Sequence, residues 1–179
     1  MWRYEAQSGY PENATWRHDA IQFATLHVVG TNNGRREIEL DDKSKALDAV
    51  DARDAANWKW LQAAFAAASK PDVKALVIAM QADISRVNWT RDCSRKYRSK
   101  CDGFAALRDA LISQSAALRK PVLLVHGDTG RLCVDRAFGG ERGSNLWRLN
   151  SAGDWVVDAI VVEVDAAVMK KPFGFRRLL

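Results

Sequence analysis

The stretch VKALVIAM, residues 73–80, is apolar at nearly every position and lacks the alternation of a strand that faces water on one side. Such runs are typical of strands that are buried on both faces, as in sheets covered by layers on two sides. The stretch KPVLLVHGD, residues 120–128, repeats this pattern and then breaks at a glycine. A helical segment precedes each of them. We therefore predict two neighbouring parallel strands inside an α/β fold.

The flanking segments extend this prediction to one domain over residues 1–179. Alanine-rich and leucine-rich periodicity predicts helices near residues 46–69 and 103–118. Further strands are expected near residues 21–29, 131–135, 145–149 and 155–164. Residues 1–19 are interpreted as an extended lead-in, and residues 31–45 and 84–102 as polar loops. The expected architecture is a mixed β-sheet with flanking helices on one face.

Composition excludes several classes of protein. The formal net charge is +5, and the cations gather in residues 91–100 and near the C-terminus, which is typical of solvated basic loops and does not favour a nucleic-acid partner. No apolar run is long enough to span a bilayer. The N-terminus lacks the apolar segment of a signal peptide, so the cytoplasm is the default expectation.

Three cysteines are present, without paired C-x-x-C spacing, which argues against a zinc knuckle. Cys93 and Cys101 lie in the same polar loop and can either form a disulfide in an oxidising compartment or stay free. Cys133 alternates with apolar residues, so we expect it to be a small buried hydrophobe.

The break after the second buried strand carries the best candidates for chemistry. His126 and Asp128 flank Gly127, and an imidazole nitrogen and a carboxylate oxygen can share one divalent cation. A His and an Asp at a strand end can equally make a turn with a capping hydrogen bond. Residues 81–83 follow the other buried strand, and the carboxyl ends of parallel neighbours meet at the edge where α/β folds place sites.

Three other polar residues follow the first strand. His27 lies inside an apolar run and is either a hydrogen-bonded core histidine or part of a site. Asn32 and Asn33 can point amides at a ligand, but Asn-Asn-Gly is first of all turn chemistry. Spacing on the first helix predicts that Trp60 packs in the core, whereas Trp58 contacts another element. No catalytic residue is assigned.

Four segments in order resemble the calcineurin-like metallophosphoesterase superfamily. They are FATLHVVGTNNG (23–34), ANWKWLQAAFAAA (56–68), ALVIAMQAD (75–83) and KPVLLVHGDTGRLCVD (120–135). The resemblance is strongest to a bacterial branch whose last motif reads V-L-L-x-H-G-D-[ST]-H. It covers roughly residues 10–178 and implies the second half of an αββα sandwich, in which metal ions and a bridging water hydrolyse phosphoesters.

The match to the family's metal site is partial. Nothing before Ile21 resembles the motifs D-x-H, G-D-x-x-D or G-N-H-[ED]. Gln81 stands where the superfamily has a His after the middle strand, and Gly130 stands at the last His of G-H-x-H. The resemblance leaves Gln81, His126 and Asp128 as metal ligands, with Asn32, Asn33 and His27 as substrate-binding residues.

Two hypotheses follow. In the first, the chain is a metallophosphoesterase-like hydrolase domain that binds Mn, Fe or Zn once a second chain supplies the missing half. In the second, it is a non-catalytic binding or structural subunit with a degenerate site and no metal. A half sandwich leaves one sheet face without its partner sheet, so either hypothesis predicts a homo-oligomer or a second chain that completes the sandwich, unless the N-terminal aromatic residues cover the face.

Overall fold

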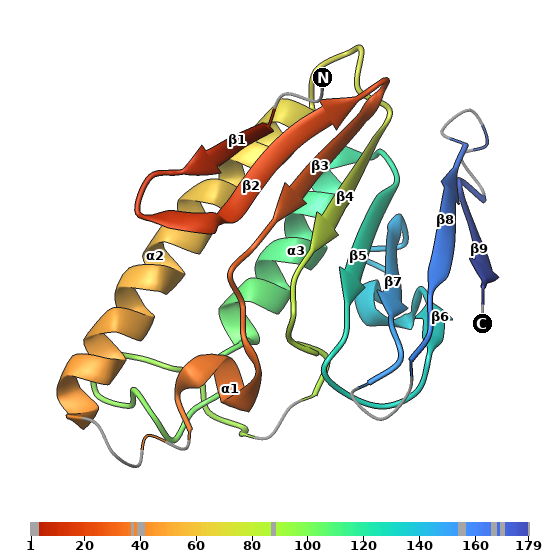
Figure 1. The fold of residues 1–179 in the computed structure, drawn as a ribbon. Coiled ribbons are helices and arrows are strands. Elements are labelled where there is room, and N and C mark those ends of the chain that lie inside the picture. Colours follow the sequence, from red (N-terminus) through yellow and green to blue (C-terminus); the bar gives the residue numbers. More distant parts are fainter. Residues whose placement is uncertain are drawn as a thin grey trace.

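The computed structural model describes residues 4–36, 38, 42–86, 89–153, 157–165, 168 and 171–178. Their elements follow in chain order in Figure 1. They are β1 (Tyr4–Gln7), β2 (Tyr10–His18), β3 (Ile21–Thr25), α1 (Gly30–Gly34), α2 (Lys43–Ala68), β4 (Ala75–Ala79), α3 (Ala105–Leu118), β5 (Val122–His126), β6 (Cys133–Asp135), a 3-10 turn (Ala137–Gly139), β7 (Leu146–Asn150), β8 (Ile160–Val164) and β9 (Phe173–Arg177).

The main sheet has seven strands in the order β1-β2-β3-β4-β5-β7-β6. Strands β3, β4, β5 and β7 are parallel neighbours, whereas β1, β2 and β6 pair antiparallel at the two edges. The predicted mixed α/β sheet with two parallel buried strands is therefore confirmed. The carboxyl ends of the parallel strands reach one common edge, which is the lower edge of the sheet in Figure 1.

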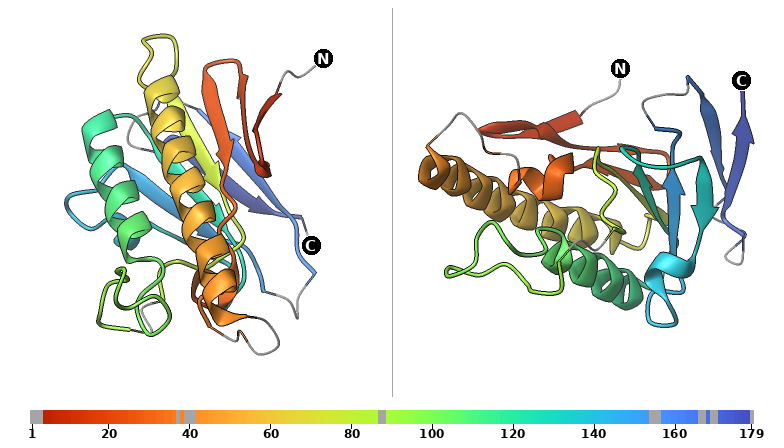
Figure 2. Two further views of the ribbon diagram at one scale, coloured as in Figure 1. Left: turned by 90° about the vertical axis from the view of Figure 1, so that its left-hand side faces the viewer. Right: turned by 90° about the horizontal axis from the view of Figure 1, so that it is seen from below.

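Helices α2 and α3 form one layer against one face of this sheet (Figure 2). Leu61 and Phe65 of α2 and Leu111 of α3 pack with the strand residues that point toward them, including Ile78 and Leu124. Asp42 begins α2, because its carboxylate accepts hydrogen bonds from the backbone amides of residues 44 and 45. The predicted helix ranges are correct to within three residues. Within the described residues, no helix is long and apolar enough to cross a bilayer.

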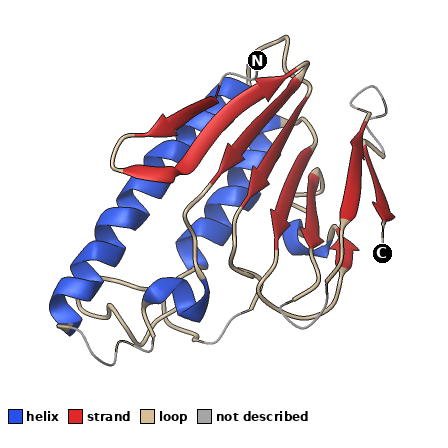
Figure 3. Cartoon of the chain, in the orientation of Figure 1, coloured by secondary structure: helices blue, strands red, loops and turns tan. Residues whose placement is uncertain are grey.

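The opposite face of the sheet carries the two-stranded β8–β9 sheet, drawn in red at the right of Figure 3. Phe173 of β9 is 1% exposed and packs with Ala75, Val77 and Leu123 of the main sheet. The Trp147 ring of β7 meets the Phe173 ring at a centroid distance of 5.9 Å. Strands β4 and β5 are therefore covered on both faces, as their apolar sequences require.

The elements differ from the expectations in four respects. Residues 1–19 are not only a lead-in: β1 and β2 form a hairpin at the sheet edge, whose turn contains Gly9 at φ +79°. Strand β9 was not predicted. The strand expected at 155–164 begins at Ile160, and residues 155 and 156 lie outside the described residues. Cys133 is exposed, because the edge strand β6 is not covered.

The expected loop at 31–45 begins with a left-handed turn, α1. Thr31, Asn32 and Asn33 have φ between 51° and 59°, a conformation that is unfavourable for residues with a Cβ atom. Asparagine is among the residues that tolerate it best. Three such residues in succession need support from the surrounding structure.

The two faces of α2 provide a test of the packing. Leu61 is fully buried, whereas Trp58 is 44% exposed. We expect Leu61→Ala to lower the free energy of unfolding by about 2–5 kcal/mol, because it leaves a cavity between α2 and the sheet. Trp58→Ala, on the same helix, should cost less than about 1 kcal/mol. Urea denaturation of both variants measures the difference, and equal losses would contradict the assigned core.

Candidate functional site

The candidate site lies where β3, β4 and β5 end side by side. Parallel pairing continues past the strands, since the amides of Leu26 and Met80 donate to Ala79 and Val125 at 2.9 and 3.0 Å. The amide of Gly127 then donates to the Gln81 carbonyl at 3.2 Å. The segments containing Gly30, Gln81 and Asp128 therefore lie at the same sheet edge, as the sequence predicts.

Gln81 bridges the two neighbouring strand ends through its side chain. Its Oε1 accepts a hydrogen bond from the Gly30 amide at 2.7 Å, and its Nε2 donates to Asp128 Oδ1 at 2.9 Å. The approach is close, because a Cβ atom on residue 30 would lie 2.9 Å from Asp128 Oδ2. Gln81 and Asp128 are thus brought together, but as partners in a hydrogen bond between loops.

His126 contacts a different group of side chains. Its side chain is fully buried, and its Nε2 lies 4.0 Å from Asp83 Oδ1. Nδ1 lies 3.1 Å from the carbonyl oxygen of Gly127, to which it donates when it carries the proton. Nε2 then has no hydrogen-bond partner among the described residues. Although His126 and Asp128 are two positions apart, they contact different groups.

Asp83 is the centre of the polar cluster around His126. It accepts hydrogen bonds from the Ser85 hydroxyl at 2.5 Å and from the Thr129 hydroxyl. Arg148 of β7 lies 3.7 Å from Asp83 and pairs with Asp135 at 2.6 Å. Burial favours the protonated carboxyl, but the hydrogen bonds from Ser85 and Thr129 outweigh it and hold the pKa of Asp83 below its usual value.

Burial also lowers the pKa of His126, which keeps its imidazole neutral near pH 7. The cluster therefore pairs a neutral buried histidine with an ionised aspartate and an arginine. Sequence reasoning noticed Asp83 only as part of the strand end, and it missed Arg148. The one available signal for Arg148 was a charged residue between apolar positions of a short strand.

The expected substrate-binding residues serve the fold. Asn32 is buried: its Nδ2 donates to the Cys101 carbonyl at 2.8 Å, and its Oδ1 accepts from the Gly103 amide at 2.8 Å. Asn33 donates to Asp54 of α2 at 2.7 Å. The Nδ1 atom of His27 lies 3.5 Å from Glu12 Oε2 on β2, away from the Gln81 bridge. The turn interpretation of Asn32 and Asn33 accounts for these contacts.

The residues at this edge do not fit the divalent metal ions that the family resemblance implies. Across the described part of the chain, no three His, Cys, Asp or Glu side chains lie close enough together to hold a metal ion. The Gln81 side chain already bonds Gly30 and Asp128, and His126 is enclosed. A metal would have to displace these contacts before it could bind.

Comparison of the sequence with models of known protein families gives no match, and comparisons with characterised proteins and with solved structures give none either. The resemblance to metallophosphoesterases therefore stays a prediction that rests on the four quoted segments.

The buried imidazole predicts a specific dependence of stability on pH. Because the unfolded His126 binds a proton below about pH 6.5 and the folded one resists it, the free energy of unfolding should fall as the pH drops through this range. The slope from one such group is at most about 1.4 kcal/mol per pH unit. Urea denaturation between pH 7.5 and 5 should show that His126→Leu removes this part of the slope. The exposed control His18→Leu should keep it, and equal slopes in wild type and His126→Leu would contradict the assignment.

Proposed function

We propose that this chain is a non-catalytic binding or structural subunit, derived from a metallophosphoesterase-type half domain, in which the residues of a former metal site hold loops together. The observation that carries the proposal is the Gln81 bridge between Gly30 and Asp128 at the sheet edge. Where the family has a metal-binding histidine, this chain has an amide that donates to the neighbouring carboxylate. The Gln81 side chain thus takes over a structural role.

The chemistry of two-metal hydrolysis supports the same proposal. Such a site needs several oxygen or nitrogen ligands on each ion and an open position for the attacking water. Gln81, His126 and Asp128 are the three candidates, and the imidazole is enclosed. Hydrolysis would need a partner chain to supply most ligands and to break the contact between Gln81 and Asp128.

We expect the purified chain to hold no stoichiometric Mn, Fe or Zn and to leave an aryl phosphate unhydrolysed when Mn²⁺ is added. Metal analysis and release of the aryl alcohol measure the two properties. Asp128→Ala removes a candidate metal ligand after β5. Asp72→Ala, which removes the partner of Arg17, is the matched control. Bound metal with turnover that is lost in Asp128→Ala and kept in Asp72→Ala would establish the hydrolase hypothesis instead.

The binding surface that we propose is the part of the second sheet face that β8 and β9 leave uncovered. One cross-strand row of apolar residues crosses six strands of this face, with each residue paired to the next. It consists of Tyr4, Trp16, Phe23, Val77, Leu123 and Trp147. Phe23, Val77, Leu123 and Trp147 belong to the apolar cluster around Phe173 of β9, whereas Tyr4 is 72% exposed and Trp16 stacks on Phe23 at 5.2 Å.

The occupant that this surface fits best is a second copy of the chain. The aromatic row carries no charge and ends at the edge strand β1, so two copies can bring the same row together around a two-fold axis. Aromatic residues that are partly exposed in the monomer are typical of such interfaces. Of the N-terminal aromatic residues, Tyr4, Tyr10 and Trp16 lie on β1 and β2 within the sheet itself.

Static light scattering on a size-exclusion column tests the association. We expect wild type to elute as a dimer and Tyr4→Asp to shift toward the monomer, because a carboxylate would be desolvated in the interface. Val157→Asp, at a residue that is 89% exposed outside this row, is the matched control and should stay dimeric. A monomeric wild type, or equal effects of the two variants, would contradict the proposed surface.

A further inference from the structure

A disulfide joins Cys93 and Cys101 in the loop between β4 and α3. The two sulfurs differ in their surroundings, because Cys101 is fully buried and Cys93 is half-buried. Cys93 also lines a pocket of about 410 Å³, which is open to solvent beside the start of α3. Cys93 is therefore the more exposed half of the disulfide, and Cys101 is the protected half.

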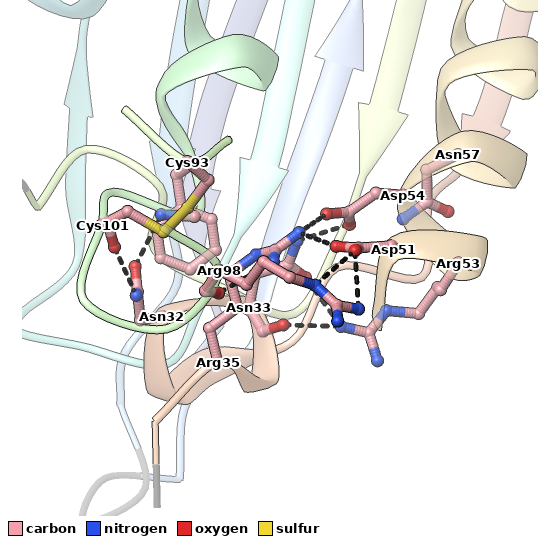
Figure 4. A network of polar contacts seen from close by, with 12 residues as sticks. Asn32, Asn33, Arg35, Asp51, Arg53, Asp54, Asn57, Cys93, Arg98 and Cys101 are labelled. Atoms are coloured by element: carbon pink, nitrogen blue, oxygen red, sulfur yellow. Dashed lines mark hydrogen bonds and ion pairs between the residues drawn. A yellow bond between two sulfur atoms is a disulfide. The ribbon is translucent and has the colours of Figure 1, made fainter. Parts of the chain in front are cut away.

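The disulfide-closed loop is a main support of the left-handed turn α1 (Figure 4). Both polar atoms of the Asn32 amide bond the end of the loop, at the Cys101 carbonyl and the Gly103 amide. The fit is tight, because a Cβ atom on residue 103 would lie 2.6 Å from the Asn32 carbonyl oxygen. Since the turn is intrinsically unfavourable, its conformation depends on where this loop is held.

The loop is also tied to the first half of α2. Arg98 donates to Asp51 at 2.9 Å and to Asp48 at 2.6 Å. Arg35, next to the left-handed turn, donates to the Arg98 carbonyl at 3.0 Å and to Asp54 at 2.6 Å. The loop, the turn and the helix thus form one network, and the disulfide is the covalent link that closes it.

We propose that Cys93 is a site of thiol–disulfide exchange, and that reduction of the Cys93–Cys101 bond releases the loop and loosens the left-handed turn. This site is separate from the Gln81 bridge and does not depend on the proposed subunit function. Exposed disulfides are the more easily reduced ones, which agrees with the half-buried position of Cys93.

The exchange has two steps. The thiolate of a small thiol attacks Cys93 Sγ, the bond to Cys101 breaks, and Cys101 leaves as a thiolate that takes up a proton. A second small thiolate attacks the small-molecule sulfur of this mixed disulfide and releases the Cys93 thiolate, which is then protonated. Two thiols are oxidised to one small disulfide, and the protein gains two electrons and two protons.

The lining of the pocket selects the class of thiol. Four carboxyl groups line it, together with the guanidinium of Arg35. They belong to Asp54, Asp92, Asp102 and Asp109. Arg35 pairs with Asp54, and Arg108 pairs with Asp102, so Asp92 and Asp109 leave the lining itself negative, because the cations of residues 91–100 are not among the residues that line it. A cationic thiol should therefore approach Cys93 more readily than an anionic one.

The first experiment measures the rate at which cysteamine and mercaptoacetate reduce the Cys93–Cys101 disulfide at equal thiolate concentration. Each rate is divided by the rate at which the same thiol reduces a small neutral disulfide. The experiment uses the Cys133→Ser variant, which removes the exposed free thiol. We expect cysteamine to reduce the protein roughly tenfold faster at low salt, and high salt to abolish the difference. The double variant Asp92→Asn, Asp109→Asn should narrow the rate difference between the two thiols at low salt. Equal normalised rates, or two free thiols at positions 93 and 101 in protein purified without reductant, would overturn the proposal.

The second experiment measures hydrogen exchange before and after reduction with dithiothreitol. Removal of the cross-link should speed exchange of peptides covering residues 30–36 and 91–103 by about tenfold or more, while β4 and β5 keep their protection. The double variant Cys93→Ser, Cys101→Ala should behave like the reduced protein. Unchanged exchange at residues 30–36 would overturn the coupling to the turn, and loss of protection throughout the sheet would show a purely structural disulfide.

Discussion

Burial of the central strands on both faces is the constraint on which the rest of the structure depends. Leu76 of β4 and Leu124 of β5 point toward the helices, whereas Ala75 of β4 and Leu123 of β5 point to the opposite face, and all four are fully buried. Each face therefore needs its own layer. Helices α2 and α3 provide one layer completely. The short β8–β9 sheet provides the other layer over β4, β5 and β7, where Ile21 and Phe23 of β3 join the same apolar cluster, while Tyr4 of β1 is 72% exposed.

Backbone strain arises where the parallel strand β3 ends. The left-handed turn after β3 places three residues with a Cβ atom at positive φ, at about 1–2 kcal/mol each. Compensation comes from contacts distant in sequence: Asn32 bonds the disulfide-closed loop, and Arg53 of α2 donates to the Asn33 carbonyl at 2.7 Å. Such strain persists only where the surroundings hold it. The conformation of the turn therefore depends on the contacts that the loop and α2 make with it.

The periodic parts of the fold could be predicted from the sequence, and the parts held by tertiary contacts could not. Apolar runs identified β4 and β5, and spacing on α2 placed Trp60 against the core, where it is partly buried. Strand β2 has the sequence YPENATWRH, which lacks the alternation of apolar and polar residues that predicts a strand. It lies next to the edge strand β1. Its Asn13 faces α2 and donates to Asn57 at 2.9 Å, a contact between distant segments that no local pattern announces. The same limit applies to the common edge of Gln81, His126 and Asp128, whose positions were predicted and whose contacts were not.

The backbone at Asp128 explains why His126 and Asp128 do not form one site. Two residues that are two positions apart would point to the same side if the strand continued through them. Asp128 instead has φ +77°, and its carboxylate contacts Gln81 and the backbone near Gly30, while His126 stays with Asp83. Nothing in the residues His-Gly-Asp specifies the positive φ of Asp128. Polar groups gather at the carboxyl edge of an α/β sheet because loops begin there, and the same groups can bind a ligand or join the loops. In this chain the imidazole is enclosed and the carboxylate is hydrogen-bonded, so joining the loops is the role that their contacts support.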